Sequence, residues 1–194
     1  MEKLNIGFGI TGSFCTHKLI LEEIKILVEK GYNIIPILSD SVQKFSTRFG
    51  RKENFISEIE RITGNVVVSN IVEAEPIGPN NLIDVFVVAP TTGNTLSKLA
   101  NAITDNAVTM VFKSHVRNNK PVVVGISSND ALGLNLKNIA TLLNTKNIYF
   151  VPFGQDDPVK KPKSLIADYS KIEDTILSAV KGEQIQPLLL REGK

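Results

Sequence analysis

The chain has 194 residues, 42% of them hydrophobic and 22% charged, with a formal net charge of +2, which suits one domain with a sizeable core. Lys and Arg are spread along the chain, which argues against a nucleic-acid-binding surface, and one Cys and two His predict neither an internal disulfide nor a transition-metal site. No apolar run reaches the length of a membrane span and residues 1–9 lack the apolar core of a signal peptide, so we expect a cytoplasmic protein.

Apolar spacing predicts strands that alternate with helices. In chain order, the expected elements are strand 4–9, helix 14–30, strand 33–38, helices 41–49 and 54–62, strand 85–89, helices 95–103 and 105–116, strand 122–126, helix 136–143, a last strand 148–151 and a final helix 170–181. Gly31 is expected to end the first helix, and Pro36 to place the second strand at a sheet edge or strand end.

Three segments fall outside this pattern. Residues 66–75 fit either a strand or an extended excursion, residues 152–163 read as a loop, and the apolar tail 184–190 suits packing on its own core or on a neighbouring subunit. The alternation predicts an α/β, Rossmann-like, doubly wound parallel sheet in a single domain of residues 1–194, with a C-terminal helix and tail. Residues 152–194 are expected to contribute contacts with other copies or with a partner.

Small and hydroxyl-bearing residues follow four of the predicted strands. The first such loop, residues 7–13, has Gly9 and Gly12 for close backbone approach but no third glycine at the dinucleotide spacing, which weakens an NAD interpretation. The carboxyl ends of parallel strands share an edge, so the loops should converge and bind a phosphate group, although Ser, Thr and Asn also cap ordinary helices. The candidate cofactor-binding residues are Gly9, Thr11, Gly12, Ser13, Phe14, Ser39, Ser41, Ala89, Pro90, Thr91, Thr92, Asn94, Thr95, Ser127, Ser128 and Asn129.

A resemblance strengthens the phosphate-site interpretation. Residues 84–108, DVFVVAPTTGNTLSKLANAITDNAV, resemble the A-P-x-(S/T)-A-N-T-x-x-K-x-A-x-G-I-x-D-N-x signature of the flavin-containing cysteine decarboxylase family. The matching residues are Ala89, Pro90, Asn94, Thr95, Lys98, Ala100, Ile103, Asp105 and Asn106, while Gly93 replaces the usual Ala. The resemblance implies a Rossmann-like FMN flavoprotein, with Ser39 or Ser41 near the FMN phosphate. It also implies a homo-oligomer, a trimer or a multiple of one, with flavin sites between protomers.

The chain departs from the decarboxylases at two places. Asn129 aligns with the last residue of their A-P-A-M-N segment, but residues 131–134 replace the Met- and Trp-containing clasp that follows it. Their catalytic His has no counterpart between Leu19 and Val88, which leaves His17 as the candidate catalytic residue or as a structural one.

The second histidine and the cysteine have plain alternatives. For His115 we favour a solvated or interface histidine over a catalytic one, and for Cys15 a small buried packing residue over a thiol of lowered pKa.

Residues 154–165, together with residues 129–139 and 187–190, resemble one branch of the family. That branch implies a sporulation protein of the mother cell, which works with a separate, nicotinamide-binding A subunit in the aromatising two-electron oxidation of a dihydropyridine dicarboxylate. Candidate partners for the substrate carboxylates are Lys98, Arg117, Lys160 and Lys161. Two alternatives remain: a flavin-dependent decarboxylase of a cysteine-containing substrate, and a non-catalytic assembly or substrate-delivery subunit that retains the fold.

Overall fold

The structure, a computed structural model, describes residues 3–190. Its strands are β1 Asn5–Ile10, β2 Asn33–Leu38, β3 Val85–Thr91, β4 Val122–Ser128, β5 Ile148–Phe150, β6 Phe153–Asp157 and β7 Lys161–Ala167. Its α-helices are α1 His17–Glu29, α2 Asp40–Lys44, α3 Lys52–Thr63, α4 Ile71–Ala74, α5 Gly93–Ala100, α6 Ala107–Arg117, α7 Leu136–Leu143 and α8 Ile172–Ala179. Short 3₁₀ turns, η1 Phe14–Thr16, η2 Glu75–Ile77 and η3 Tyr169–Lys171, adjoin α1, α4 and α8.

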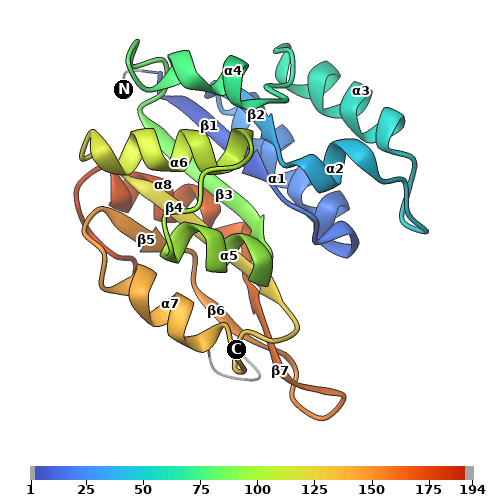
Figure 1. Cartoon of the computed structure of the whole chain (residues 1–194), viewed down its shortest axis with the longest axis vertical. Coiled ribbons are helices and arrows are strands. Elements are labelled where there is room, and N and C mark those ends of the chain that lie inside the picture. The colour runs from blue at the N-terminus through green and yellow to red at the C-terminus, as the bar shows by residue number, and fades with distance from the viewer. Residues whose placement is uncertain (1–2, 191–194) are drawn as a thin grey trace.

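The centre of the molecule is a parallel sheet. β1 pairs with β2 and β3, β3 with β4, and β4 with β5, all in parallel, which gives the strand order 2-1-3-4-5. α5, α6 and α7 cover one face of this sheet and α1 and α8 the other (Figure 1). Every residue of β3 is buried, as expected for a central strand covered on both faces. The predicted doubly wound α/β fold is confirmed.

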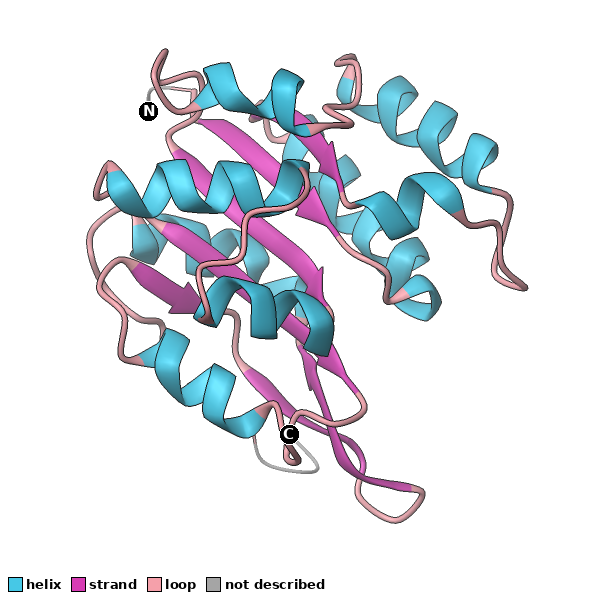
Figure 2. Ribbon diagram, in the orientation of Figure 1, coloured by secondary structure: helices cyan, strands magenta, loops and turns pink. Residues whose placement is uncertain are grey.

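The sheet continues into an antiparallel hairpin that the sequence did not predict. Residues 152–163 were expected to be a loop, but they contain β6 and the start of β7, so β5 is not the last strand. β7 pairs antiparallel with the end of β4, where Ser127 lies opposite Ile166 and Ser128 opposite Leu165. The outer half of the hairpin extends past the parallel strands as a two-stranded ribbon (Figure 2). Its residues are exposed or half-buried and polar, so they lack the alternation that marks a strand packed on a core.

Other predicted boundaries shift locally. The helix expected at 41–49 ends at Lys44, and Thr47 and Gly50 then exchange backbone hydrogen bonds of 3.0 and 3.1 Å in a tight turn. The ambiguous segment 66–75 combines one strand-like residue, Val68, with helix α4. Gly31 ends the first helix with a φ of +94°, as predicted.

The outer strands of the sheet are covered by the chain's own segments. β2 lies at an edge, as Pro36 predicted, and Val68 exchanges two backbone hydrogen bonds with it. The side-chain amide of Gln184 bonds the backbone N–H and C=O of Phe150 in β5, each at 2.7 Å. The tail pairs with Phe153 of β6: the Phe153 N–H donates to the Leu188 carbonyl at 3.0 Å, and the Leu190 N–H donates to the Phe153 carbonyl at 2.9 Å. The tail thus pairs with its own chain through backbone bonds, while the side chains of Leu189 and Leu190 stay exposed, so the alternative of a neighbouring subunit stays a prediction.

Candidate functional site

The predicted loops meet at the carboxyl edge of the parallel strands. The Thr11 hydroxyl, after β1, donates to the Pro90 carbonyl at 2.6 Å and accepts from the Thr92 N–H at 3.1 Å, which ties the first loop to the loop after β3. The Ser13 and Ser127 hydroxyls lie 2.7 Å apart, which joins the first loop to the end of β4. These contacts bring together residues more than 75 positions apart in the chain.

The loop after β2 closes the same group. The Ser39 hydroxyl lies 3.1 Å from that of Ser41. A methyl group added at Gly12 would lie 2.8 Å from Ser41 Oγ, so only glycine allows the two loops to approach this closely. The hydroxyls of Ser13, Ser39 and Ser41 therefore lie around the backbone of Gly12. We call these three residues the serine group.

Not every predicted cofactor residue turns toward this group. Ala89 and Thr91 are fully buried, and the Thr91 hydroxyl donates to the Val88 carbonyl at 2.5 Å. Thr92 caps α5 by accepting from the Thr95 N–H at 3.2 Å. The exposed side chain of Asn129 accepts from Ser164 at 3.3 Å.

A carboxylate that sequence reasoning missed lies at the start of α5. Asp130 accepts a 2.8 Å bond from the Ser128 hydroxyl and bonds of 3.0 and 2.9 Å from the Asn135 amide. A methyl added at Gly93 would lie 2.6 to 2.7 Å from polar atoms of these three side chains, which explains why the family's Ala is replaced by Gly here. Asp130 thus places a negative charge at the amino end of α5, where it is favoured, and a second anion there would meet like charge. An anion is better accommodated at the serine side of the edge.

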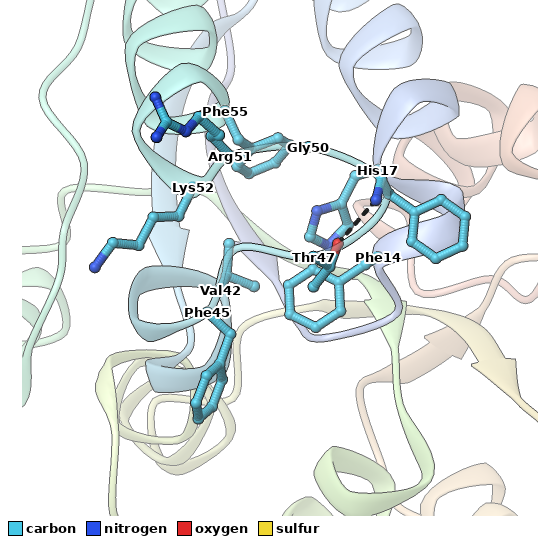
Figure 3. Close-up of a pocket in the computed structure, with 10 residues that line it drawn as sticks. Phe14, His17, Val42, Phe45, Thr47, Gly50, Arg51, Lys52 and Phe55 are labelled. Atoms are coloured by element: carbon cyan, nitrogen blue, oxygen red, sulfur yellow. Dashed lines mark hydrogen bonds between the residues drawn. The ribbon is translucent and has the colours of Figure 1, made fainter.

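His17 is a buried ring beside the first loop. Its Nε2 lies 2.9 Å from the Thr11 carbonyl, which can only accept, so Nε2 carries the hydrogen. Burial lowers the pKa of His17, and the ring is therefore neutral near pH 7 with Nδ1 as its acceptor. The ring stacks on Phe55 at 4.6 Å and lies 5.1 Å from Phe14. These rings line a hollow together with Arg51 and Lys52, whose charged ends point away from His17 (Figure 3).

The expectations for His115 and Cys15 were wrong. His115 is not solvated: it is 1% exposed, lies 6.2 Å from the Phe86 ring, and burial lowers its pKa to about 4. Within residues 3–190 its Nε2 has no hydrogen-bond partner. Cys15 is exposed rather than packed, with Sγ 3.8 Å from Ser13 Oγ.

The candidate carboxylate partners divide into two places. Lys98 pairs with Asp105 at 2.6 Å and, with Arg117, lines a separate hollow between α5, α6 and α7. Arg117 ends α6, just before the chain enters the amino end of β4, so neither cation faces the serine group. Lys160 and Lys161 lie at the tip of the hairpin, on the same edge as the loops, and Lys161 pairs with Asp156 at 2.7 Å.

The parallel strands have the order 2-1-3-4-5, and hydroxyl-rich loops follow β1 and β3, the neighbouring strands between which the strand order reverses. In flavodoxin-like doubly wound proteins this is the place where FMN binds. The flavoprotein family model matches residues 1–181, and the chain belongs to this family. Family membership confirms the resemblance drawn from residues 84–108.

The relatives also agree with the branch inferred from the sequence, which is that of the dipicolinate synthase B subunits. The chain is 49% identical to the B subunit of dipicolinate synthase from Bacillus subtilis over 185 residues, which cover 95% of this chain and 92% of the relative. It matches the crystal structure of the dipicolinate synthase B subunit from Bacillus halodurans with a TM-score of 0.89 and 49% identity, over 97% of this chain and 96% of that one.

More distant structures share the fold alone. The FMN-dependent cysteine decarboxylase SpaF matches with a TM-score of 0.66 and 18% identity, over 91% of this chain and 97% of that one. Within residues 3–190, no helix is long and apolar enough to cross a membrane.

Proposed function

We propose that this chain acts as the B subunit of a dipicolinate synthase. With an A subunit it would oxidise dihydrodipicolinate to dipicolinate, in the mother cell of a spore former, through an FMN site at the carboxyl edge of the sheet. The observation that carries the proposal is the convergence of the hydroxyl-bearing loops after β1 and β3, in a chain 49% identical to the B subunit of that enzyme from Bacillus subtilis.

The residues fit an FMN phosphate on chemical grounds. Ser13, Ser39 and Ser41 supply hydroxyl donors, and Gly12 leaves backbone room among them. Asp40 lies between Ser39 and Ser41, but its carboxylate pairs with Lys44 at 2.6 Å. Its negative charge is therefore balanced and does not oppose a bound phosphate. When bound, oxidised flavin supplies a hydride acceptor for the dihydropyridine.

The chain's own residues would bind the substrate and move the proton. Aromatisation removes a hydride equivalent and a proton, and neutral His17 has an open acceptor at Nδ1 beside the first loop. Lys160 and Lys161 lie on the same edge and suit the two substrate carboxylates. A nicotinamide site is left to the A subunit, because the first loop lacks the third glycine of that fingerprint. We further propose a homo-oligomer, a trimer or a multiple of one.

An FMN titration tests the cofactor site. The purified protein should develop a perturbed flavin absorption spectrum on addition of FMN. Ser41→Ala should weaken FMN binding about 10- to 100-fold, since a hydrogen bond to a charged group is worth about 1.5–3 kcal/mol. Ser178→Ala, on α8, is the matched control and should leave the affinity unchanged. No spectral change with the wild-type protein would refute the FMN site and favour a non-catalytic role.

The reaction needs its own assay. This chain alone should make little dipicolinate from dihydrodipicolinate, and adding the A subunit should restore the activity. Full activity of the isolated chain would contradict the proposed division of labour. Release of carbon dioxide from a cysteinyl peptide at an enzyme-like rate would instead favour the decarboxylase alternative, against which the replaced clasp at residues 131–134 counts.

A further inference from the structure

One buried hydroxyl near the serine group is not used by any step above. Tyr169 begins η3, directly after β7, and is only 5% exposed. Within residues 3–190 its hydroxyl has no hydrogen-bond partner. A buried polar group without a partner costs free energy, so such groups call for a specific reason.

The surroundings of this hydroxyl belong to the site. Its polar neighbours are the hydroxyls of Ser127 and Thr16, although neither meets it with hydrogen-bond geometry. The Thr16 hydroxyl donates to the Ser13 carbonyl at 2.8 Å, and Ser127 Oγ lies 2.7 Å from Ser13 Oγ. The Tyr169 hydroxyl therefore lies next to the place where the first loop contacts the end of β4.

The sequence leaves space for the ring at this position. A methyl group added at Gly125, in the buried part of β4, would lie 3.3 Å from Cε1 of Tyr169. Glycine thus lets the ring lie close against the strand two residues before Ser127. The ring is fixed by packing, while the hydroxyl is left to make its bond elsewhere.

We infer that Tyr169 is a positioning residue for the phosphate-bearing ligand of this site, acting through Ser127. The inference rests on the proposed FMN function. Without a ligand, the Ser13 and Ser127 hydroxyls satisfy one another. When Ser13 turns its hydroxyl to a phosphate oxygen, Ser127 loses that partner, and the Tyr169 hydroxyl donates to Ser127 Oγ in its place. Ligand binding thereby satisfies a group that the protein alone leaves unpaired.

Removing the Tyr169 hydroxyl should therefore affect stability and ligand affinity in different directions. Tyr169→Phe keeps the ring against Gly125 and removes only the hydroxyl. The thermal midpoint of the ligand-free protein should stay the same or rise, because an unpaired buried group is lost. The affinity for FMN should fall about fivefold, within the range of a single neutral hydrogen bond. A purely structural tyrosine would instead lower the midpoint and leave the affinity unchanged.

A double-mutant cycle with Ser127→Ala tests the route. The fivefold effect of Tyr169→Phe should vanish in the Ser127→Ala background. Tyr149→Phe, in β5, is the matched control, since that tyrosine lies away from the four loops and should not alter FMN affinity. Equal FMN affinity of wild type and Tyr169→Phe, or a loss that persists without the Ser127 hydroxyl, overturns the inference.

The same variants distinguish a failure of this inference from a failure of the FMN proposal. If the wild-type protein binds no FMN, the FMN proposal fails, and titration with inorganic phosphate then decides on Tyr169. Weaker phosphate binding by Tyr169→Phe supports the positioning role. Equal binding, or no phosphate binding by the wild type, overturns it.

Discussion

Lowering the pH from 7.5 to 5 should destabilise the fold through His115. Burial holds its pKa at about 4, against an ordinary value of 6.5, and Lys120 adds to this effect. A proton therefore binds the unfolded chain more readily than the folded one. The stability that this group contributes is fully present above pH 6.5 and is lost as the pH falls toward 4.

The size of the effect follows from the two pKa values. At pH 5 the unfolded chain is protonated at this residue while the folded chain is largely neutral, and the free energy of unfolding falls by about 2 kcal/mol relative to pH 7.5. His17, whose pKa is also lowered by burial, contributes with the same sign. Its contribution must be separated from that of His115.

Urea unfolding of wild type and His115→Leu at pH 5, 6 and 7.5 makes this separation, because His17 is present in both proteins. Leucine is apolar, does not titrate and leaves no unpaired Nε2 beside Phe86. The variant should lose most of the decline between pH 7.5 and 5, so that the gap between the proteins changes by about 2 kcal/mol. A change in the gap below about 0.5 kcal/mol would refute the assignment of this titration to His115.

Three further predictions concern stability. Ala102 has a φ of 56° where the family signature has Gly, so Ala102→Gly should raise the unfolding free energy in urea by about 0.5–1 kcal/mol; a decrease would show that this strain is not relieved. Gly93→Ala should lower the thermal midpoint, at a cost of about 1–3 kcal/mol, because the methyl meets Asp130 at 2.7 Å; an unchanged midpoint would contradict that packing. Truncation after Gln184 removes the backbone bonds to Phe153 and should cost about 1–3 kcal/mol in urea unfolding. In sedimentation with an A subunit, the same truncation should weaken assembly more than folding, and intact assembly would argue against the tail as a partner contact.

The parallel part of the fold could be predicted from sequence because its signals are local. Apolar runs such as residues 85–89 and the helical spacing after them identify each unit, and βαβ handedness then fixes the sheet. The hairpin could not be predicted in this way. Its outer half packs on no core, and its pairing with Ser127 and Ser128 depends on contacts that leave no period in the sequence.

The same distinction applies to the site. The serine loops were found because small hydroxyl residues follow strands, and topology alone brings strand ends together. Asp130 and Tyr169 were missed, since each matters through a neighbour far away in the chain: Gly93 for the first and Ser127 for the second. Lys98 and Arg117 were chosen by charge alone, and charge does not say which edge of the sheet a helix residue reaches.

The covering of the outer strands has a consequence for how this chain associates. Exposed strand edges recruit other strands and promote aggregation. Here Val68 occupies the edge of β2, the Gln184 amide takes the place of a strand beside Phe150, and the tail pairs with Phe153. At these positions the hydrogen-bonding groups that would template a foreign strand are already engaged. For one copy to continue the sheet of another through these positions, the chain's own segments would first have to be displaced.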